Sequence, residues 1–188
     1  MLRGRLVYLR PAERSDLPSF VEWLSDAGTT GNLTMRAPLS MPLEERWFEG
    51  MVERQGRDGY HFVICLLADG RAIGVASLFE LDAVNGQAGF GIFIGDEAMR
   101  GRGYGTDALD AIVDFGFGEL RLERIWLDVF TDNGRAMRSY EKAGFVLEGT
   151  QRRAFYRRGA YRDTHRMSLL RSEWEELSRP KSWDLEGR

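Results

Sequence analysis

The sequence of 188 residues contains one cysteine, Cys65, so a disulfide within the chain is excluded. Cys65 lies in the longest uninterrupted apolar run, residues 62–68 (FVICLLA), which is far too short to span a membrane. The first residues, MLRGRLVYLRPAER, contain no hydrophobic stretch of the secretory type. These absences predict a buried free thiol and a cytoplasmic protein with no membrane partner.

Motifs for metal binding and for nucleophilic catalysis are also missing. The two histidines, His61 and His165, fall in separate predicted strands, and the sequence has no HExxH motif and no serine nucleophile elbow. No metal is therefore expected. No zinc finger or RNA-recognition motif is present either, so a nucleic acid is not indicated as the partner.

Composition and charge predict one globular domain with an uneven surface. Hydrophobic residues make up 43% of the chain and charged residues 29%. We expect a domain over residues 1–175 and a tail over 176–188. The net charge is −3, but residues 133–171 hold ten Arg and Lys against three Asp and Glu, a local balance of +7. This basic third indicates either an anionic partner, RNA or ribosomes included, or a solvated arginine-rich surface.

The order of hydrophobic patterns predicts an α/β (α+β) fold with a mixed sheet of about seven strands and helices on both faces. After a strand at residues 5–10, the sequence favours a helix from about 17 to 24, a loop over 27–40 and a helix at 41–55. The rest follows as strands 61–68, 72–81 and 88–95, a helix at 107–117, a strand at 123–130, a helix at 133–144 and strands 145–156 and 160–170. The order is therefore β-α-α-β-β-β-α-β-α-β-β.

A glycine-rich, cationic turn, RGRGYGTDA (residues 100–108), joins a predicted strand to a predicted helix. A helix N-terminus offers unpaired N–H groups, and glycines let an anion approach that backbone, so the turn is typical of a phosphate site. The Walker pattern fails because no lysine follows, and the dinucleotide fingerprint fails because the glycines are spaced GxGxG. The pattern [Q/R]-x-x-G-x-[G/A] is met by Arg100, Gly103 and Gly105.

Four stretches in the same order resemble the GNAT superfamily of acetyl-CoA-dependent N-acetyltransferases, and within it the RimJ/RimL group, which includes spermidine N-acetyltransferases. They are LVYLRPAERSDL, IGDEAMRGRGYGTDAL, NGRAMRSYEKAGFVLEG and GAYRDTHRMSLLRSEW, and the resemblance as a whole extends over about residues 2–174. The resemblance implies a GNAT fold, acetyl-CoA as co-substrate and a homodimer.

The resemblance also implies where the cofactor lies. The strand before the glycine turn should splay from its neighbour, so that the main chain of Ile92, Phe93 and Ile94 contacts the pantetheine arm. The pyrophosphate should lie on the backbone N–H groups of the turn, which are those of Arg100, Gly101, Arg102, Gly103, Tyr104, Gly105 and Thr106.

The helix after Asn133 is the second expected part of the site. Asn133, Ala136, Met137 and Tyr140 are spaced i, i+3, i+4 and i+7 and share one face. By resemblance Asn133 bonds the pantetheine arm and Tyr140 lies near the thioester sulfur. A thiol has a pKa of about 8.5 and a tyrosine about 10, so a phenol is a matched proton donor to the leaving thiolate. Without the resemblance, Asn133 is an ordinary helix cap and Tyr140 a half-buried tyrosine.

The general base is less well defined by the sequence. Many relatives carry a glutamate where this chain has Gly89. Glu80 and Asp82, at the end of the preceding strand, remain as catalytic candidates acting through water, or they are simply solvated carboxylates. Because the base position is altered, a CoA-binding module without turnover is an alternative to an enzyme.

The pocket for the amine acceptor is expected to be formed by the two N-terminal helices, the loop of residues 27–43 and the last hairpin. That loop, GTTGNLTMRAPLS, has no carboxylate and contains Arg36. A polyamine would need convergent carboxylates, so we rank a spermidine-type acceptor below a protein N-terminal amine or a small-molecule amine. Arg36 is the predicted substrate-binding residue, for an acceptor that carries a carboxylate or phosphate elsewhere.

Overall fold

One mixed sheet of eight strands organises the computed structural model, which describes residues 1–35 and 39–185. The sheet order is β1-β2-β3-β4-β5-β6-β8-β7. The strands are β1 (Leu2–Arg3), β2 (Val7–Pro11), β3 (Gly59–Leu66), β4 (Ala72–Asp82), β5 (Gln87–Ile94), β6 (Arg124–Phe130), β7 (Val146–Arg157) and β8 (Ala160–Leu170). The predicted mixed sheet with helices on both faces is confirmed. The extra strand is the short edge strand β1.

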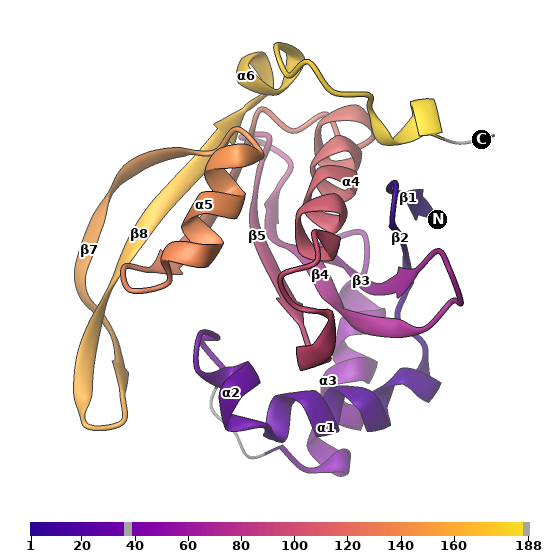
Figure 1. Cartoon of the computed structure of the whole chain (residues 1–188), viewed down its shortest axis with the longest axis vertical. Coiled ribbons are helices and arrows are strands. Elements are labelled where there is room, and N and C mark those ends of the chain that lie inside the picture. Colours follow the sequence, from indigo (N-terminus) through magenta and orange to yellow (C-terminus); the bar gives the residue numbers. More distant parts are fainter. Residues whose placement is uncertain (36–38, 186–188) are drawn as a thin grey trace.

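Helices cover both faces of the sheet (Figure 1). Helix α4 packs against one face and α5 lies on the same side of the sheet, whereas α1 and α3 pack against the other face. The α-helices are α1 (Leu17–Ser25), α2 (Ala27–Thr30), α3 (Met41–Arg54), α4 (Tyr104–Gly118), α5 (Gly134–Lys142) and α6 (Arg171–Glu175), and the 3-10 turns are η1 (Arg14–Asp16), η2 (Glu97–Met99) and η3 (Ser182–Leu185). The segment predicted as a loop over residues 27–40 begins with α2, whose first turn is capped by Asp26.

Alternate residues of β3 divide the core in two. Phe62, Ile64 and Leu66 join the large cluster that α4 covers, and Val63 and Cys65 join a smaller cluster with α1 and α3. A central strand covered on both faces must be apolar throughout, which explains the run FVICLLA. Cys65 is a buried free thiol, as the sequence predicted.

The sheet splits between β5 and β6. These strands pair in parallel only from Gln87 with Arg124 to Gly89 with Trp126. Beyond that point β6 continues beside β8 as far as Phe130, while β5 continues beside β4 as far as Ile94. Within the described residues, the backbone of residues 90–94 therefore has no strand partner on its β6 side. The splay that the resemblance implied is present.

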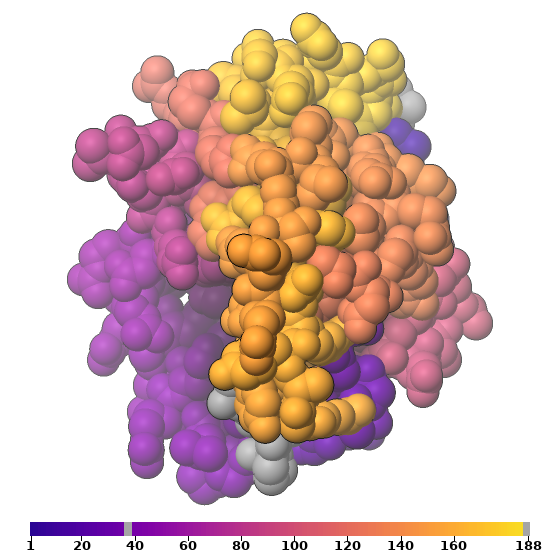
Figure 2. Space-filling view, turned by 90° about the vertical axis from the view of Figure 1, so that its left-hand side faces the viewer, coloured from indigo at the N-terminus to yellow at the C-terminus, as the bar shows by residue number. Residues whose placement is uncertain are grey.

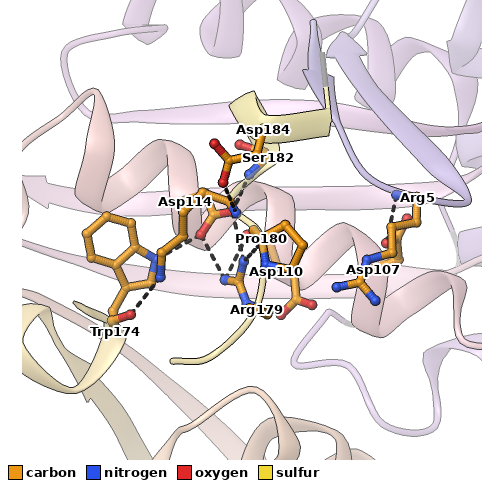
Figure 3. A network of polar contacts seen from close by, with 10 residues as sticks. Arg5, Asp107, Asp110, Asp114, Trp174, Arg179, Pro180, Ser182 and Asp184 are labelled. Atoms are coloured by element: carbon orange, nitrogen blue, oxygen red, sulfur yellow. Dashed lines mark hydrogen bonds and ion pairs between the residues drawn. The ribbon is translucent and has the colours of Figure 1, made fainter. Parts of the chain in front are cut away.

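Two aspartates of α4 fasten that helix to distant parts of the chain (Figure 3). The Asp107 carboxylate accepts the backbone N–H groups of Arg5, Leu6 and Val7 at 2.8–3.0 Å, which holds residues 4–6 as a turn and delays the first long strand to Val7. Asp114, 1% exposed, accepts bonds from Trp174, from both terminal nitrogens of Arg179 and from the Ser182 amide. Residues 179–182 are thus bonded to α4, and the division of a tail from the domain at residue 175 stays a prediction.

The long hairpin of β7 and β8 reaches back to the N-terminal helices. Arg157 donates to the carbonyl oxygen of Leu33 at 2.7 Å, and Arg162 donates to that of Gly31 at 2.9 Å. Figure 2 shows a recess between this hairpin, drawn orange to yellow, and the purple residues of the N-terminal half. The recess opens on the sheet face opposite α4 and α5, which leaves two approaches to the split in the sheet.

Candidate active site

The glycine turn delivers free backbone N–H groups to one point. Gly101 and Gly103 have φ of +76° and +87°, a left-handed backbone that glycine adopts without strain. Gly103 is the N-cap of α4, and the first helical bond runs from the Asp107 amide to its carbonyl at 3.0 Å. The amides of Tyr104, Gly105 and Thr106 precede that bond and have no partner among the described residues, so they are donors at the positive end of the helix dipole. This geometry suits an anion.

Arg100 has a different place from the one expected. Its side chain donates to the carbonyl oxygens of Ile94 at 3.0 Å and Gly95 at 3.2 Å, and to the Thr29 hydroxyl at 2.6 Å. Its own amide is bonded to the Glu97 carbonyl. Arg100 therefore ties the end of β5 to α2 and positions the turn. Arg102, which is exposed, is the arginine whose charge is open to solvent there.

The unpaired stretch of β5 has two different faces. Ile92 and Ile94 pack on the large core cluster beneath α4. Phe93 points the other way and packs edge-on against Trp23 of α1 at 6.4 Å between ring centroids. Both faces are thus filled by side chains, so the main chain at the β6-facing edge is what the strand offers to a ligand.

Helix α5 brings the four predicted residues to one face. The Asn133 side-chain oxygen accepts the Ala136 amide at 3.2 Å, so Asn133 is a helix cap, and its side-chain NH₂ remains available as a donor. Ala136, Met137 and Tyr140 are half-buried against the large core cluster. Tyr140 packs edge-on against Phe90 of β5 at 6.3 Å between ring centroids. Tyr140 therefore lies beside the split in the sheet.

Burial raises the pKa of Tyr140 to about 12. Within the described chain its hydroxyl has no hydrogen-bond partner, so the O–H is a free donor. Because this pKa lies well above that of a thiol, about 8.5, the phenol is better suited to donate a hydrogen bond to a developing thiolate than to give up its proton fully. The reference pKa of a tyrosine, about 10, had suggested a closer match to the pKa of the leaving thiol.

The structure explains why Gly89 carries no acidic side chain. A Cβ on Gly89 would lie 2.4 Å from the ring of Phe79, which pairs with it on β4. The Phe79 ring packs edge-on against Trp126 of β6 at 5.5 Å. An aromatic pair therefore fills the space that a glutamate at position 89 would need.

Glu80 and Asp82 line a pocket of about 400 Å³ on the face of the sheet that α4 does not cover. Its other lining residues are Gln87, Arg124, Trp126 and Arg166. The Asp82 carboxylate accepts the Val84 and Asn85 amides and the Asn85 side-chain NH₂ at 2.6–3.0 Å, and the Asn85 side chain in particular lowers its pKa. Asp82 is thereby committed to the turn after β4, whereas Glu80 is exposed and has no partner in the described chain.

The remaining predictions for the site concern Arg36 and metals. Arg36, the predicted substrate-binding residue, lies outside the described residues. Among residues 1–35 and 39–185, no three His, Cys, Asp or Glu side chains gather in a way that would hold a metal ion. No helix in the same ranges is long and apolar enough to cross a membrane.

Sequence reasoning missed the residues that surround Glu80. Trp126, Arg124 and Arg166 come from β6 and β8, and Phe79 from β4. One signal was present in the strand ERIWLDVF, where Arg124, Trp126 and Asp128 alternate with apolar residues. Such alternation in a central strand indicates a face without a helix over it, and this is the face that bears the pocket.

Known proteins resemble this chain over most of its length. A family model described as an acetyltransferase (GNAT) domain matches residues 6–146. The chain is 32% identical over 186 residues to a probable N-acetyltransferase of Bacillus subtilis, covering 94% of this chain and 100% of that protein. It is 29% identical to the spermidine N(1)-acetyltransferase of Escherichia coli, covering 89% and 88%. The structure of spermidine N-acetyltransferase from Vibrio cholerae in complex with CoA and spermine has a TM-score of 0.84 at 26% identity, covering 91% and 99%.

Proposed function

This chain belongs to the GNAT acetyltransferase family, and from that premise we propose that it transfers the acetyl group of acetyl-CoA to a primary amine by direct attack in a ternary complex. That it is an acetyl-CoA-dependent N-acetyltransferase follows from the family match and from relatives named for that activity. The observation that supports the proposed site best is the split between β5 and β6, flanked by the glycine turn and by Tyr140.

In the proposed site the two ends of the cofactor meet different elements. The pyrophosphate lies on the free amides of residues 101–106, with Arg102 adding positive charge. The pantetheine arm pairs with the main chain of Ile92, Phe93 and Ile94, and the Asn133 side-chain NH₂ donates to it. Ala136 and Met137 line the arm from α5. Arg100 acts by holding the turn in place, since its side chain and amide are already bonded.

In the proposed reaction the main task of the protein is to hold the amine and the thioester in the correct orientation. The acceptor nitrogen, as the neutral amine, attacks the thioester carbonyl; the C–S bond then breaks, CoA leaves as a thiolate, and the nitrogen loses its extra proton to water. The Tyr140 hydroxyl donates a hydrogen bond to the sulfur as its negative charge develops. Of the two carboxylates predicted as the base, Glu80 is the one that remains free to act on the acceptor side, directly or through water, because Asp82 is bonded within its turn.

Four finer assignments remain predictions. Membership of the RimJ/RimL group, the homodimer and a protein N-terminus as acceptor rest on resemblance. A spermidine-type acceptor gains support from the names of the relatives in Escherichia coli and Vibrio cholerae, against the lower rank that the acceptor loop suggested.

The test is calorimetric titration of the protein with acetyl-CoA and with CoA, followed by a free-thiol assay against primary amines and peptides with free N-termini. We expect micromolar binding of both cofactor forms and release of thiol with at least one class of acceptor. Binding without release from any acceptor would favour the module without turnover. No binding would contradict the whole proposal.

A further inference from the structure

A histidine and a serine form a hydrogen-bonded pair on the sheet face opposite α4. The ring Nδ1 of His61 lies 2.9 Å from the hydroxyl oxygen of Ser77, its direct neighbour across β3 and β4. His61 packs edge-on against Trp47 of α3 at 5.6 Å between ring centroids, and both members of the pair are half-buried. The pair therefore belongs to the face on which the recess opens (Figure 2), and no step of the proposed reaction uses it yet.

The register of the sheet places Ser77 beside the open part of the split. Ser77 pairs with Gly91 of β5, which has no partner on β6 among the described residues. Neighbouring strands lie about 4.8 Å apart, so the serine is one strand away from the open edge. A Cβ on Gly91 would have only the ring of Phe79 within 4 Å, at 3.4 Å, in the described chain. The backbone next to Ser77 is therefore not covered by a side chain of its own.

The reacting centre of the proposed site lies at the same level as this serine. In that site the pantetheine arm follows residues 92–94 of β5, and Tyr140, which packs against Phe90, meets the sulfur at the end of the arm. The thioester carbonyl then lies near Gly91, between these two levels. Tyr140 packs on the α4 side of the sheet, and Ser77 projects from the other side. A donor for the leaving sulfur and a polar group for the incoming amine thus flank the thioester from opposite faces.

Glu80 lies further from this level than Ser77 does. Glu80 belongs to a bulge of β4, where two residues lie opposite Ala88 alone. At Ala88 the strands β5 and β6 are still paired, through Ile125. Three positions separate Ala88 from Gly91, or about 10 Å of strand. Ser77 is therefore the better placed group to meet an amine at the thioester.

His61 is suited to take a proton from that serine. Burial lowers the pKa of His61, and the positive charge of Arg54 on α3 lowers it further, so the ring is neutral at neutral pH. Its other neighbours from α3 and β4, Trp47 and Ser77, are uncharged. In the tautomer with its proton on Nε2, the ring accepts the Ser77 hydroxyl at Nδ1. A proton that reaches this hydroxyl can therefore pass on to the ring.

Resting on the proposed acetyl transfer, we propose that Ser77 and His61 form a proton relay that converts the incoming ammonium group into the attacking amine. The ammonium N–H gives its proton to the Ser77 oxygen, directly or through one water, while the Ser77 proton moves to Nδ1 of His61. The products are a neutral amine and an imidazolium ring, so charge is conserved, and the ring later returns its proton to solvent. The first proton transfer thus belongs to a pair that lies nearer the thioester than Glu80 does.

The test is the pH dependence of kcat/KM for thiol release, with butylamine and with a peptide that has a free N-terminus. The relay lets wild type use the ammonium form, whereas a variant without it depends on the fraction of free amine. His61→Asn keeps a hydrogen-bonding group but cannot take the proton, and Ser77→Ala breaks the path before the ring.

The size of the expected loss depends on the acceptor. An alkylamine has a pKa of about 10, so with butylamine we expect each variant to lose about 100-fold at pH 7 and to approach wild type near pH 10. A peptide N-terminus has a pKa of about 8, so the loss at pH 7 should be about tenfold and should disappear above pH 8. Below the pKa of the amine, kcat/KM should rise about tenfold per pH unit in the variants and stay level in wild type down to the pKa of His61, which lies below 6.5.

The second histidine of the chain supplies the matched control. Nδ1 of His165 lies 2.9 Å from the Thr150 hydroxyl, in the same kind of pair, but across β7 and β8 on the far side of β6 from β5. His165→Asn should change neither the size nor the pH profile of kcat/KM. The double variant of His61→Asn and Ser77→Ala should lose no more than either single variant, because both changes interrupt one path.

Each other outcome has one meaning. Equal losses at pH 7 and pH 10 would overturn the relay and leave the pair with a structural role. Wild-type kinetics in either single variant, or a loss in the double variant equal to the product of the single losses, would also overturn it, and the acetyl transfer would stand. Failure of wild type to release thiol with any primary amine would instead remove the proposed function, and the relay with it.

Discussion

Helices α4 and α5 flank the same split in the sheet but are held in opposite ways. Eight residues of α4 are buried, and Asp107 and Asp114 bond it to segments about 100 and 65 residues away. Helix α5 is described in full and has no buried residue; it is capped by Asn133 and rests on half-buried side chains. The helix proposed to bind phosphate is thus held in place by its burial and by its bonds to distant segments. The helix proposed to meet the reacting sulfur is held by little besides its cap and one apolar face.

The strongest way to break this contrast is to remove the anchor of α4. Asp114→Ala leaves Arg179, whose side chain is 16% exposed, with Asp110 at 3.3 Å as its remaining acid, and it leaves Trp174 without an acceptor. Because a partly orphaned buried cation is costly, we expect a loss of about 3–5 kcal/mol in the free energy of unfolding. Urea unfolding measures it.

The matched change on α5 is Ser139→Ala. Within residues 1–35 and 39–185, the Ser139 hydroxyl is bonded only to the Arg135 carbonyl of its own helix, at 3.2 Å. We expect a change of less than about 0.5 kcal/mol. Similar losses for the two variants would refute the contrast between the helices.

Removing one hydroxyl from α5 tests its chemical role. In Tyr140→Phe the ring contacts with Phe90 and Phe145 remain, and the lost O–H had no partner in the described chain. We expect kcat to fall about 100-fold, the loss typical of one donor to a developing anion, with unchanged affinity for acetyl-CoA and unchanged stability. Steady-state kinetics and calorimetry measure the two effects. An unchanged kcat would remove Tyr140 from the mechanism.

A smaller effect separates the two roles given to Asn133. Asp at this position still caps α5 through its oxygen but loses the NH₂ donor proposed for the pantetheine arm. We expect Asn133→Asp to keep the stability of wild type and to weaken acetyl-CoA binding about fivefold, as for one lost hydrogen bond. Asn133→Ala should weaken binding equally and also cost about 1 kcal/mol of stability. Unchanged binding in Asn133→Asp would leave Asn133 as a cap only.

The smallest effect concerns the pH dependence of Tyr140. Burial raises its pKa to about 12, so the phenol keeps its proton throughout the range in which an ordinary tyrosine, near 10, would lose it. We expect kcat to show no decline with an apparent pKa near 10 when it is measured up to pH 10.5. The same shift implies that stability is lost as pH rises from about 10 to 12, where the unfolded phenol ionises first. A kcat decline centred on pH 10 would contradict the burial of this hydroxyl.

The features that the sequence predicted correctly depend on residues that are close together in the chain. The turn at residues 100–108 could be assigned to a helix N-terminus because glycine spacing and helix start lie within nine residues of each other. The shared face of Asn133, Ala136, Met137 and Tyr140 followed from helical periodicity alone. Both features are in the structure as expected.

The features that the sequence did not predict depend on contacts between residues that are far apart in the chain. The hydrogen bond from Arg100 to Thr29 joins residues 71 positions apart, and the bond from Arg166 to Asp128 joins residues 38 positions apart. Neither has a local signature. The bulge that exposes Glu80 also depends on its pairing with β5, so a single strand pattern, AIGVASLFEL, gave no sign of it.

The two anchors of α4 have a consequence for the order in which the protein assembles during synthesis. The turn before β2 leaves the ribosome about 100 residues ahead of Asp107, to which it bonds, and Arg179 follows Asp114 by 65 residues. The nascent N-terminal strands must therefore wait for α4, and α4 must wait for residues 174–182. Because domains complete their folding only when such distant contacts can close, we expect ribosome-bound chains stalled before Arg179 to be far more sensitive to protease than released ones.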